Sequence, residues 1–111
     1  MRDNVKGGAL TETTFFVLLT LYRPNHGYGI MQFIEEKTKG RLYLGPGTLY
    51  GAINNLLSKG WIAPCGENQG SPKKLYIITE EGKRAAEREL KRLTELCAIA
   101  REIIEGSRDD R

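Results

Sequence analysis

Neutral hydrogen-bonding side chains recur along residues 45–62, "GPGTLYGAINNLLSKGWI", and this segment contains no carboxylate. At 100° per residue, one arc of a helix here holds the apolar residues Leu49, Ala52, Ile53, Leu56 and Leu57. The remaining arc holds Thr48, Tyr50, Gly51, Asn54, Asn55 and Ser58. Such groups can reach base edges or phosphate oxygens without repulsion, whereas an ordinary solvated face is usually rich in Glu and Lys. We therefore predict nucleic-acid contacts by Thr48, Tyr50, Asn54 and Asn55.

Charge is distributed unevenly along the chain, whose net charge is +3. Residues 1–79 hold nine Lys/Arg against five Asp/Glu, and residues 80–111 hold eight against nine. Between Glu36 and Glu67 no acidic residue occurs, although four basic ones do. A surface that approaches phosphate must avoid carboxylates, so this pattern favours a polyanionic partner. Chance in an apolar segment is the alternative explanation.

Three helices and a hairpin are expected to position these groups. Helical patterns cover residues 10–22, with Thr11 as N-cap, then 28–39 before Gly40, and 46–59. Two β-prone runs, 61–65 and 73–78, flank the loop "GENQGSP" and predict a hairpin with Lys73 and Lys74 at its foot. This order predicts a mainly α fold with a small β-hairpin, the winged helix-turn-helix. In that fold the third helix enters the major groove, and the hairpin contacts the neighbouring backbone.

One long helix is expected from residue 80 to about residue 105, with Thr79 as its N-cap. Its length of about 39 Å exceeds what a domain of this size can bury. A coiled-coil-like spacing predicts a dimer interface of Leu90, Leu93, Cys97, Ala100 and Ile104, with a second copy of the chain as partner. Packing against its own domain is the alternative. We expect a DNA-binding domain at residues 1–79, followed at 80–111 by a dimerisation helix and a short tail.

Three segments resemble the PadR-like transcriptional regulators: "HGYG" at 26–29, "GRLYLGPGTLYGAINNLLSKGWI" at 40–62 and "GSPKKLYIITEEGK" at 70–83. The resemblance implies a homodimeric winged-helix repressor of the short subclass, with one C-terminal dimerisation helix. The two third helices of such a dimer would meet successive major grooves on a pseudo-palindromic operator. This chain has Gly51 where the family often has proline, and Asn54 and Asn55 where Arg or Lys is common. Tyr28, in the first motif, is a further candidate phosphate contact, with a role in capping the core as the alternative.

The resemblance also implies that some members sense small aromatic molecules near the dimer interface. In this chain the candidate lining consists of Phe15, Phe16, Trp61 and Leu93. An ordinary core is the alternative explanation for these residues.

Several functional classes are disfavoured by the composition. The single histidine, His26, and scattered carboxylates offer no converging catalytic set, so we expect neither an enzyme nor a cofactor. Cys65 and Cys97 lie 32 residues apart and indicate neither a disulfide framework nor a metal site. The absence of a membrane-spanning run or an export signal predicts a cytoplasmic protein. A winged-helix module that binds proteins rather than DNA is the main rival function.

Overall fold

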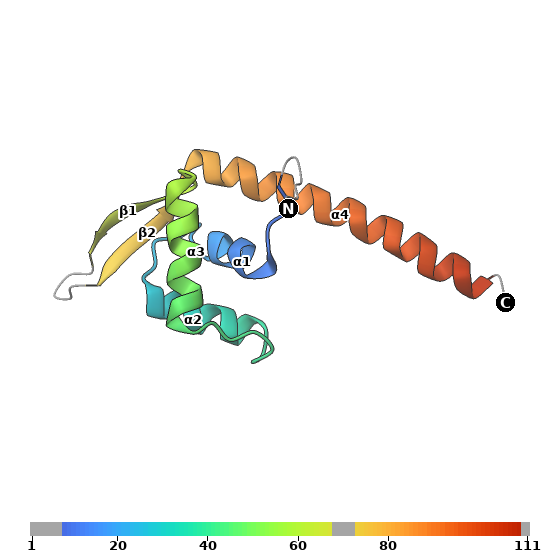
Figure 1. Cartoon of the computed structure of the whole chain (residues 1–111), viewed down its shortest axis with the longest axis horizontal. Helices are drawn as coiled ribbons and strands as arrows, with labels where there is room; N and C mark the ends of the chain where they lie inside the picture. Colours follow the sequence, from blue (N-terminus) through green and yellow to red (C-terminus); the bar gives the residue numbers. More distant parts are fainter. Residues whose placement is uncertain (1–7, 68–72, 110–111) are drawn as a thin grey trace.

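Four helices and a two-stranded hairpin form the structure, a computed structural model that describes residues 8–67 and 73–109. The elements follow in the order α1 (Glu12–Thr20), α2 (Gly27–Lys37), α3 (Pro46–Ser58), β1 (Ile62–Glu67), β2 (Lys74–Ile78) and α4 (Glu80–Asp109). The first three helices pack together, the hairpin extends from one side of them, and α4 projects from the other (Figure 1). The molecule is therefore elongated, with extents of 63 × 30 × 25 Å. The predicted mainly α fold is confirmed.

Side-chain caps fix where the first two helices begin. The Thr11 hydroxyl accepts a hydrogen bond from the Thr14 N–H at 3.1 Å, which confirms the predicted N-cap of α1. The Nδ1 atom of His26 accepts one from the Gly29 N–H at 3.2 Å, so α2 begins one residue earlier than predicted. It also ends at Lys37 rather than residue 39, because Lys39 adopts the left-handed region with φ of 52°.

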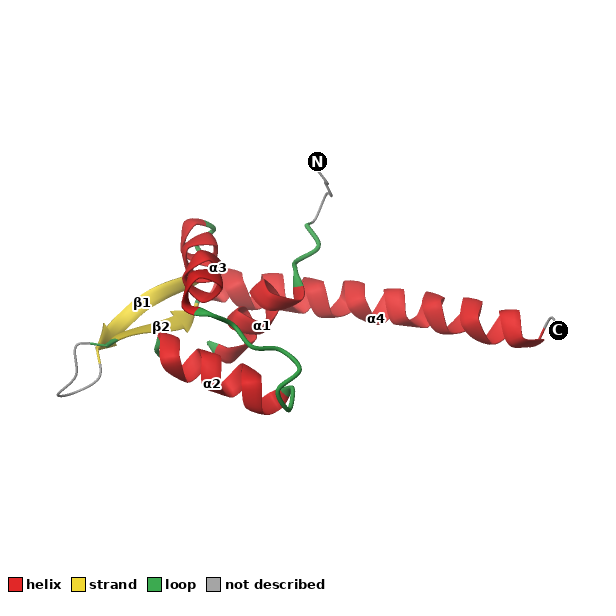
Figure 2. Cartoon of the chain, turned by 60° about the horizontal axis from the view of Figure 1, so that its bottom comes forward, coloured by secondary structure: helices red, strands yellow, loops and turns green. Residues whose placement is uncertain are grey.

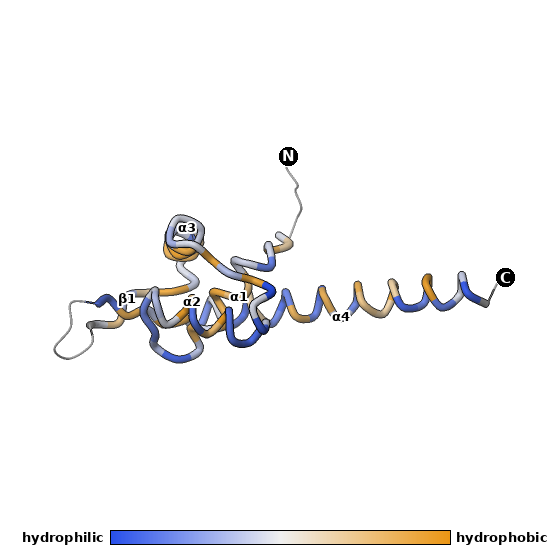
Figure 3. Tube along the Cα trace, turned by 90° about the horizontal axis from the view of Figure 1, so that it is seen from below, coloured by the Kyte–Doolittle hydropathy of each residue, from blue (hydrophilic) through white to orange (hydrophobic). Residues whose placement is uncertain are grey.

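The core lies where α1, α2 and α3 meet the base of the hairpin. Its fully buried side chains include Leu18, Ile30, Leu49, Ile53 and Leu56. On α3 the predicted apolar arc turns inward, with Leu57 only half-buried. Viewed nearly end-on, α3 has its hydrophobic residues on the side facing the rest of the domain (Figure 3). The sequence prediction of the inward and outward faces of α3 is therefore confirmed.

The hairpin, called the wing below, is antiparallel and pairs Ile62 with Ile78. Its register shifts between Pro64 and Gly66, which marks a bulge. Each strand begins one residue later than predicted, and most of the predicted loop, residues 68–72, lies outside the described residues. The backbones of Asn25 and Tyr76 exchange two hydrogen bonds, of 3.1 and 2.9 Å. These bonds fix β2 against the segment that leads into α2.

Helix α4 begins on the domain and then leaves it (Figure 2). The Thr79 hydroxyl accepts a hydrogen bond from the Gly82 N–H at 3.0 Å, which confirms the predicted cap. The helix has 30 residues and a length of about 45 Å, ending at Asp109 rather than near residue 105. Its first turns bury Ala85, Ala86 and Glu89, whereas most later side chains are exposed. Residues 1–7 of the expected first domain and residues 110–111 of the expected tail lie outside the described residues.

The buried carboxylate of Glu89 connects α4 to the beginning of the described chain. It accepts hydrogen bonds from the Leu10 N–H at 3.2 Å and from Nε of Arg92 at 2.9 Å. The hydrogen bond from Arg92 holds the pKa of Glu89 below its ordinary value, against the opposing effect of burial. The sequence does not indicate this contact, because a glutamate among the apolar positions of a long helix is usually exposed to solvent.

Candidate nucleic-acid interface

The outward side of α3 carries the side chains predicted to contact nucleic acid. We call this side the recognition face, and it consists of the exposed residues Thr48, Tyr50, Gly51, Asn54, Asn55 and Ser58. Helix α3 contains no charged residue. Its N-cap, Gly45, makes no side-chain cap hydrogen bond, so the N–H groups of the first turn lack that intramolecular acceptor. The face therefore presents donors and acceptors without a carboxylate that would repel phosphate.

The predicted lysines lie where the wing approaches α2. Lys74 begins β2, and Lys73 immediately precedes it. The Nζ atom of Lys73 lies 5.9 Å from the centre of the Tyr28 ring. The structure thus brings one predicted contact of the wing close to one on α2.

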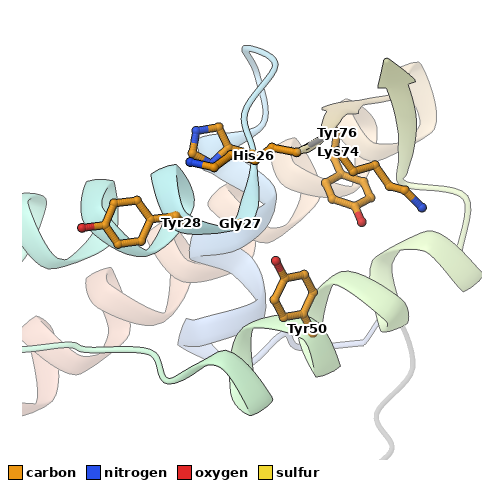
Figure 4. Close-up of a pocket in the computed structure, with 7 residues that line it drawn as sticks. His26, Gly27, Tyr28, Tyr50, Lys74 and Tyr76 are labelled. Carbon is orange, nitrogen blue, oxygen red and sulfur yellow. The ribbon is translucent and has the colours of Figure 1, made fainter. Parts of the chain in front are cut away.

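Four predicted contacts converge on one hollow of about 240 Å³ between α2, α3 and β2. We call it the tyrosine hollow, and it is lined by His26, Gly27, Tyr28, Tyr50, Lys73, Lys74 and Tyr76 (Figure 4). Thr48, Asn54 and Asn55 are exposed on α3 and do not line this hollow. The predicted site therefore divides into an open helix face and a hollow beside it.

Close packing explains the glycines of the segment "HGYG". A Cβ atom on Gly27 would lie 2.3 Å from the Tyr50 hydroxyl oxygen, and one on Gly29 would lie 2.1 Å from Oδ1 of Asn25. That Oδ1 atom also accepts a hydrogen bond from the His26 N–H at 2.9 Å. His26 thus has a structural role as the N-cap of α2. The motif thus allows Tyr50 of α3 and the Asn25 side chain to approach the first turn of α2 closely.

Comparison with known proteins identifies the family. Residues 16–88 match the family described as "Transcriptional regulator PadR-like family". The chain belongs to the PadR-like family of transcriptional regulators. That family consists of regulators rather than enzymes. No match was found among curated protein sequences.

Solved structures of PadR-family proteins share this fold. A PadR family transcriptional regulator from Eggerthella lenta is 27% identical, with a TM-score of 0.73 over 83% of this chain and 80% of that one. A PadR family regulator from Clostridium difficile is 21% identical, with a TM-score of 0.71 over 85% and 99%. Bacillus subtilis PadR in complex with operator DNA is 24% identical, with a TM-score of 0.61 over 69% of this chain and 45% of that one. The winged helix-turn-helix fold is thereby confirmed.

The second surface of this PadR-like regulator runs along α4. We call it the α4 stripe, and it consists of Leu90, Leu93, Leu96, Cys97, Ile99, Ala100, Ile103 and Ile104. Leu90 is 61% exposed and Ile104 is 54% exposed, whereas Leu93 and Ala100 are half-buried. The predicted dimer residues are thus apolar and mostly uncovered by the chain's own domain.

Helix α1 extends this apolar surface in a way that the sequence analysis missed. A hollow of about 160 Å³ lies between α1 and α4 and is lined by Phe15, Leu19, Tyr22, Ala86, Glu87 and Leu90. Leu19 and Tyr22 are each at least 40% exposed. Leu19 and Tyr22 are three residues apart and therefore share one side of the helix, whereas Val17, Leu18 and Leu21 are buried. This spacing is the signal in the sequence that indicates an exposed apolar side.

The predicted effector residues lie at different places around the base of α4. Phe15 lines the hollow between α1 and α4. Trp61 lines another hollow, of about 280 Å³, together with Lys59, Arg88 and residues of the N-terminal segment. The Lys59 ammonium lies 5.1 Å from the centre of the Trp61 ring. Phe16 packs against the core, and Leu93 is half-buried on α4. Phe15 and Trp61 therefore line two different hollows.

The described residues also bear on metal binding and on membrane crossing. Within residues 8–67 and 73–109, no group of His, Cys, Asp and Glu side chains has an arrangement that could hold a metal ion. Over the same residues no helix is long and apolar enough to cross a membrane. Cys65 and Cys97 are both exposed free cysteines.

Proposed function

We propose that this PadR-like regulator binds duplex DNA in a sequence-specific manner through the recognition face and the wing. The observation that carries the proposal is an exposed, uncharged α3 surface beside Lys73 and Lys74. Asn54 and Asn55 are suited to base edges, because an amide both donates and accepts. The two lysines are suited to backbone phosphates. The operator complex of Bacillus subtilis PadR supports the same use of the fold in this chain.

The second part of the proposal is that two copies pair through the α4 stripe. Exposed leucine and isoleucine side chains at coiled-coil spacing would lose their water contact against a matching helix. In a two-fold symmetric dimer that pairs through this stripe, residues 1–79 would bind DNA and residues 80–111 would form the dimer interface. The two recognition faces would then meet half-sites of a pseudo-palindromic operator about one helical turn apart.

As the biological outcome we propose repression, with release by a small aromatic effector. The half-buried aromatic side chains of Phe15 and Trp61 beside α4 support this part. An effector can lower DNA affinity only by its differential affinity for the DNA-competent and DNA-incompetent dimers. A planar apolar compound should therefore quench Trp61 and release DNA over one concentration range. Quenching without release would contradict control by that compound.

The experiment that tests DNA binding is fluorescence anisotropy of labelled duplexes at low salt, after selection of preferred sequences from a random duplex library. We expect saturable binding, with affinity falling linearly on a log–log salt plot. Retention on heparin provides an independent check. If neither random nor selected duplexes bind at low salt, the winged domain serves protein interaction instead.

A further inference from the structure

Tyr76 is a buried residue whose hydroxyl has no hydrogen-bond partner among the described residues. Tyr76 is only 7% exposed, and its side chain forms no hydrogen bond with any described residue. A buried hydroxyl without a partner costs free energy, so such groups usually have a protein or ligand partner. Figure 4 shows the Tyr76 hydroxyl directed from β2 into the tyrosine hollow. The Tyr50 hydroxyl points into the same hollow from α3. Both tyrosines line the same hollow.

The other groups around the hollow favour a negatively charged oxygen. The hollow lies at the first turn of α2, the positive end of an 11-residue helix. The Gly29 and Ile30 N–H groups are bonded to His26, whereas those of Gly27 and Tyr28 have no acceptor among the described residues. Lys73 and Lys74 add positive charge on the wing side. Among the described residues that line the hollow, none carries a carboxylate.

The protonation state of Tyr76 also suits an anion. Burial is the main cause that raises its pKa, and the neighbouring Tyr50 raises it further. Tyr76 therefore remains a neutral O–H donor at physiological pH.

From this convergence we infer that the tyrosine hollow is a receptor for one phosphate group, held by the hydroxyls of Tyr76 and Tyr50 and the first amides of α2. The inference rests on the proposed function, in which the phosphate belongs to the DNA backbone. A backbone phosphate carries no base identity, so the hollow sets the position of the protein on the duplex. Tyr50, although it lies on the recognition face, is then a phosphate contact, and base reading is left to Asn54 and Asn55.

The decisive variant is Tyr76→Phe, which removes only the hydroxyl oxygen. We expect the dissociation constant to rise about tenfold or more on every duplex, because a donor to a charged oxygen is lost. The ratio of affinities between duplexes should stay the same. The salt slope should also stay the same, because no cation is removed. The melting temperature of the free protein should not fall, since the hydroxyl has no partner there.

Tyr43→Phe is the matched control, because it removes the same atom from a tyrosine that is 66% exposed and lines none of the hollows described above. If Tyr76→Phe weakens DNA binding no more than Tyr43→Phe does, the inference is wrong. Should Tyr76→Phe fail to fold, Tyr50→Phe decides, because its side chain is 47% exposed. Unchanged DNA affinity in Tyr50→Phe would then overturn the inference.

A second arm identifies the source of the phosphate. Thermal unfolding is measured in inorganic phosphate and in chloride at equal ionic strength. A rise in melting temperature with phosphate in the wild type, absent in Tyr76→Phe, supports a site that also takes the free ion. No rise, together with weakened DNA binding of Tyr76→Phe, supports a site for DNA phosphate alone.

Failure of the proposed function is distinguishable from failure of this inference. If the wild type binds no duplex, the proposed function fails. Thermal unfolding in inorganic phosphate and in chloride then remains as the only test of whether the hollow binds phosphate. If the wild type binds DNA and Tyr76→Phe binds it equally well, the function stands and the hollow is not a phosphate receptor.

Discussion

The recognition face and the α4 stripe are both exposed helix surfaces, but their chemistry is opposite. The recognition face carries small or planar neutral polar groups on a helix whose other side packs against the core. The α4 stripe carries exposed leucine and isoleucine side chains on a helix that leaves its domain. A polar face without charges is suited to a polar, anionic surface, and an apolar stripe is suited to another apolar stripe. Each exposed surface thus indicates the chemistry of its own partner.

The largest expected effect comes from a charge in the α4 stripe. Leu90→Glu would place a carboxylate in the proposed seam twice, once from each copy, and should raise the dimer dissociation constant by about 100-fold or more. Leu90 is 61% exposed, so the fold of one copy should persist. Sedimentation equilibrium measures the result, with exposed Lys91→Glu on another side of α4 as control. A dimer that persists at micromolar concentration in both Leu90→Glu and Leu93→Glu would mean that the α4 stripe is not the seam.

A smaller but more selective effect is expected on the recognition face. Asn54→Ala should change the preference among duplex sequences by about 1–3 kcal/mol if the amide reads a base. Ser58→Ala is the control, because the Ser58 hydroxyl already donates to the Asn55 carbonyl oxygen at 2.9 Å. Competition binding with single-base variants of the selected duplex measures the preference. Uniform loss on all duplexes would assign Asn54 to the backbone instead.

The wing should contribute charge rather than selectivity. Lys74→Ala should weaken binding on all duplexes and reduce the log–log salt slope by about 0.9, the value for one phosphate contact. Lys91→Ala on α4 removes an equal charge away from the wing and should leave the slope unchanged. If both variants shift the slope equally, the long-range field of the protein explains the effect, and the wing makes no specific contact.

The smallest expected effect lies at the junction between the two surfaces. Glu89→Gln should lower the free energy of unfolding by about 1 kcal/mol at neutral pH, because the charged hydrogen bond with Arg92 is lost. A lowered native pKa means that stabilisation is complete above the ordinary glutamate value of 4.5 and is lost as the pH falls through the native value. Urea unfolding of both proteins from pH 7 to pH 3 should therefore show curves that converge in acid. A constant difference across this range would contradict the assignment.

The fold was predictable from the sequence because its signals are local. Thr11 and Thr79 are caps, Pro46 begins a helix, and the inward arc of α3 follows directly from the helical period. The segment that forms α1 is rich in β-branched and aromatic residues, but its apolar positions do not alternate, which favours a helix over a strand.

The tyrosine hollow and the Glu89 contact were not predictable, because they depend on residues distant in the chain. Tyr76 is one residue of the predicted hairpin, and its backbone pairing with Asn25 brings it beside the segment that leads into α2. Likewise, the hydrogen bond from Leu10 to Glu89 joins residues 79 positions apart. Helical periodicity carries no information on such contacts, since they depend on how whole elements pack.

The anchoring of α4 makes this helix a lever. Its first turns are fixed by the Thr79 cap and by the buried Glu89, and the 20 residues from Leu90 to Asp109 continue for about 30 Å. A change of about 10° in the angle at which α4 leaves the domain would move its far end by about 5 Å. In a dimer joined along that arm, small packing changes near Leu10 or Trp61 would be magnified into a different separation of the two DNA-binding halves. In such a dimer, the residues that set the operator spacing would be those at the base of α4, far from any base pair.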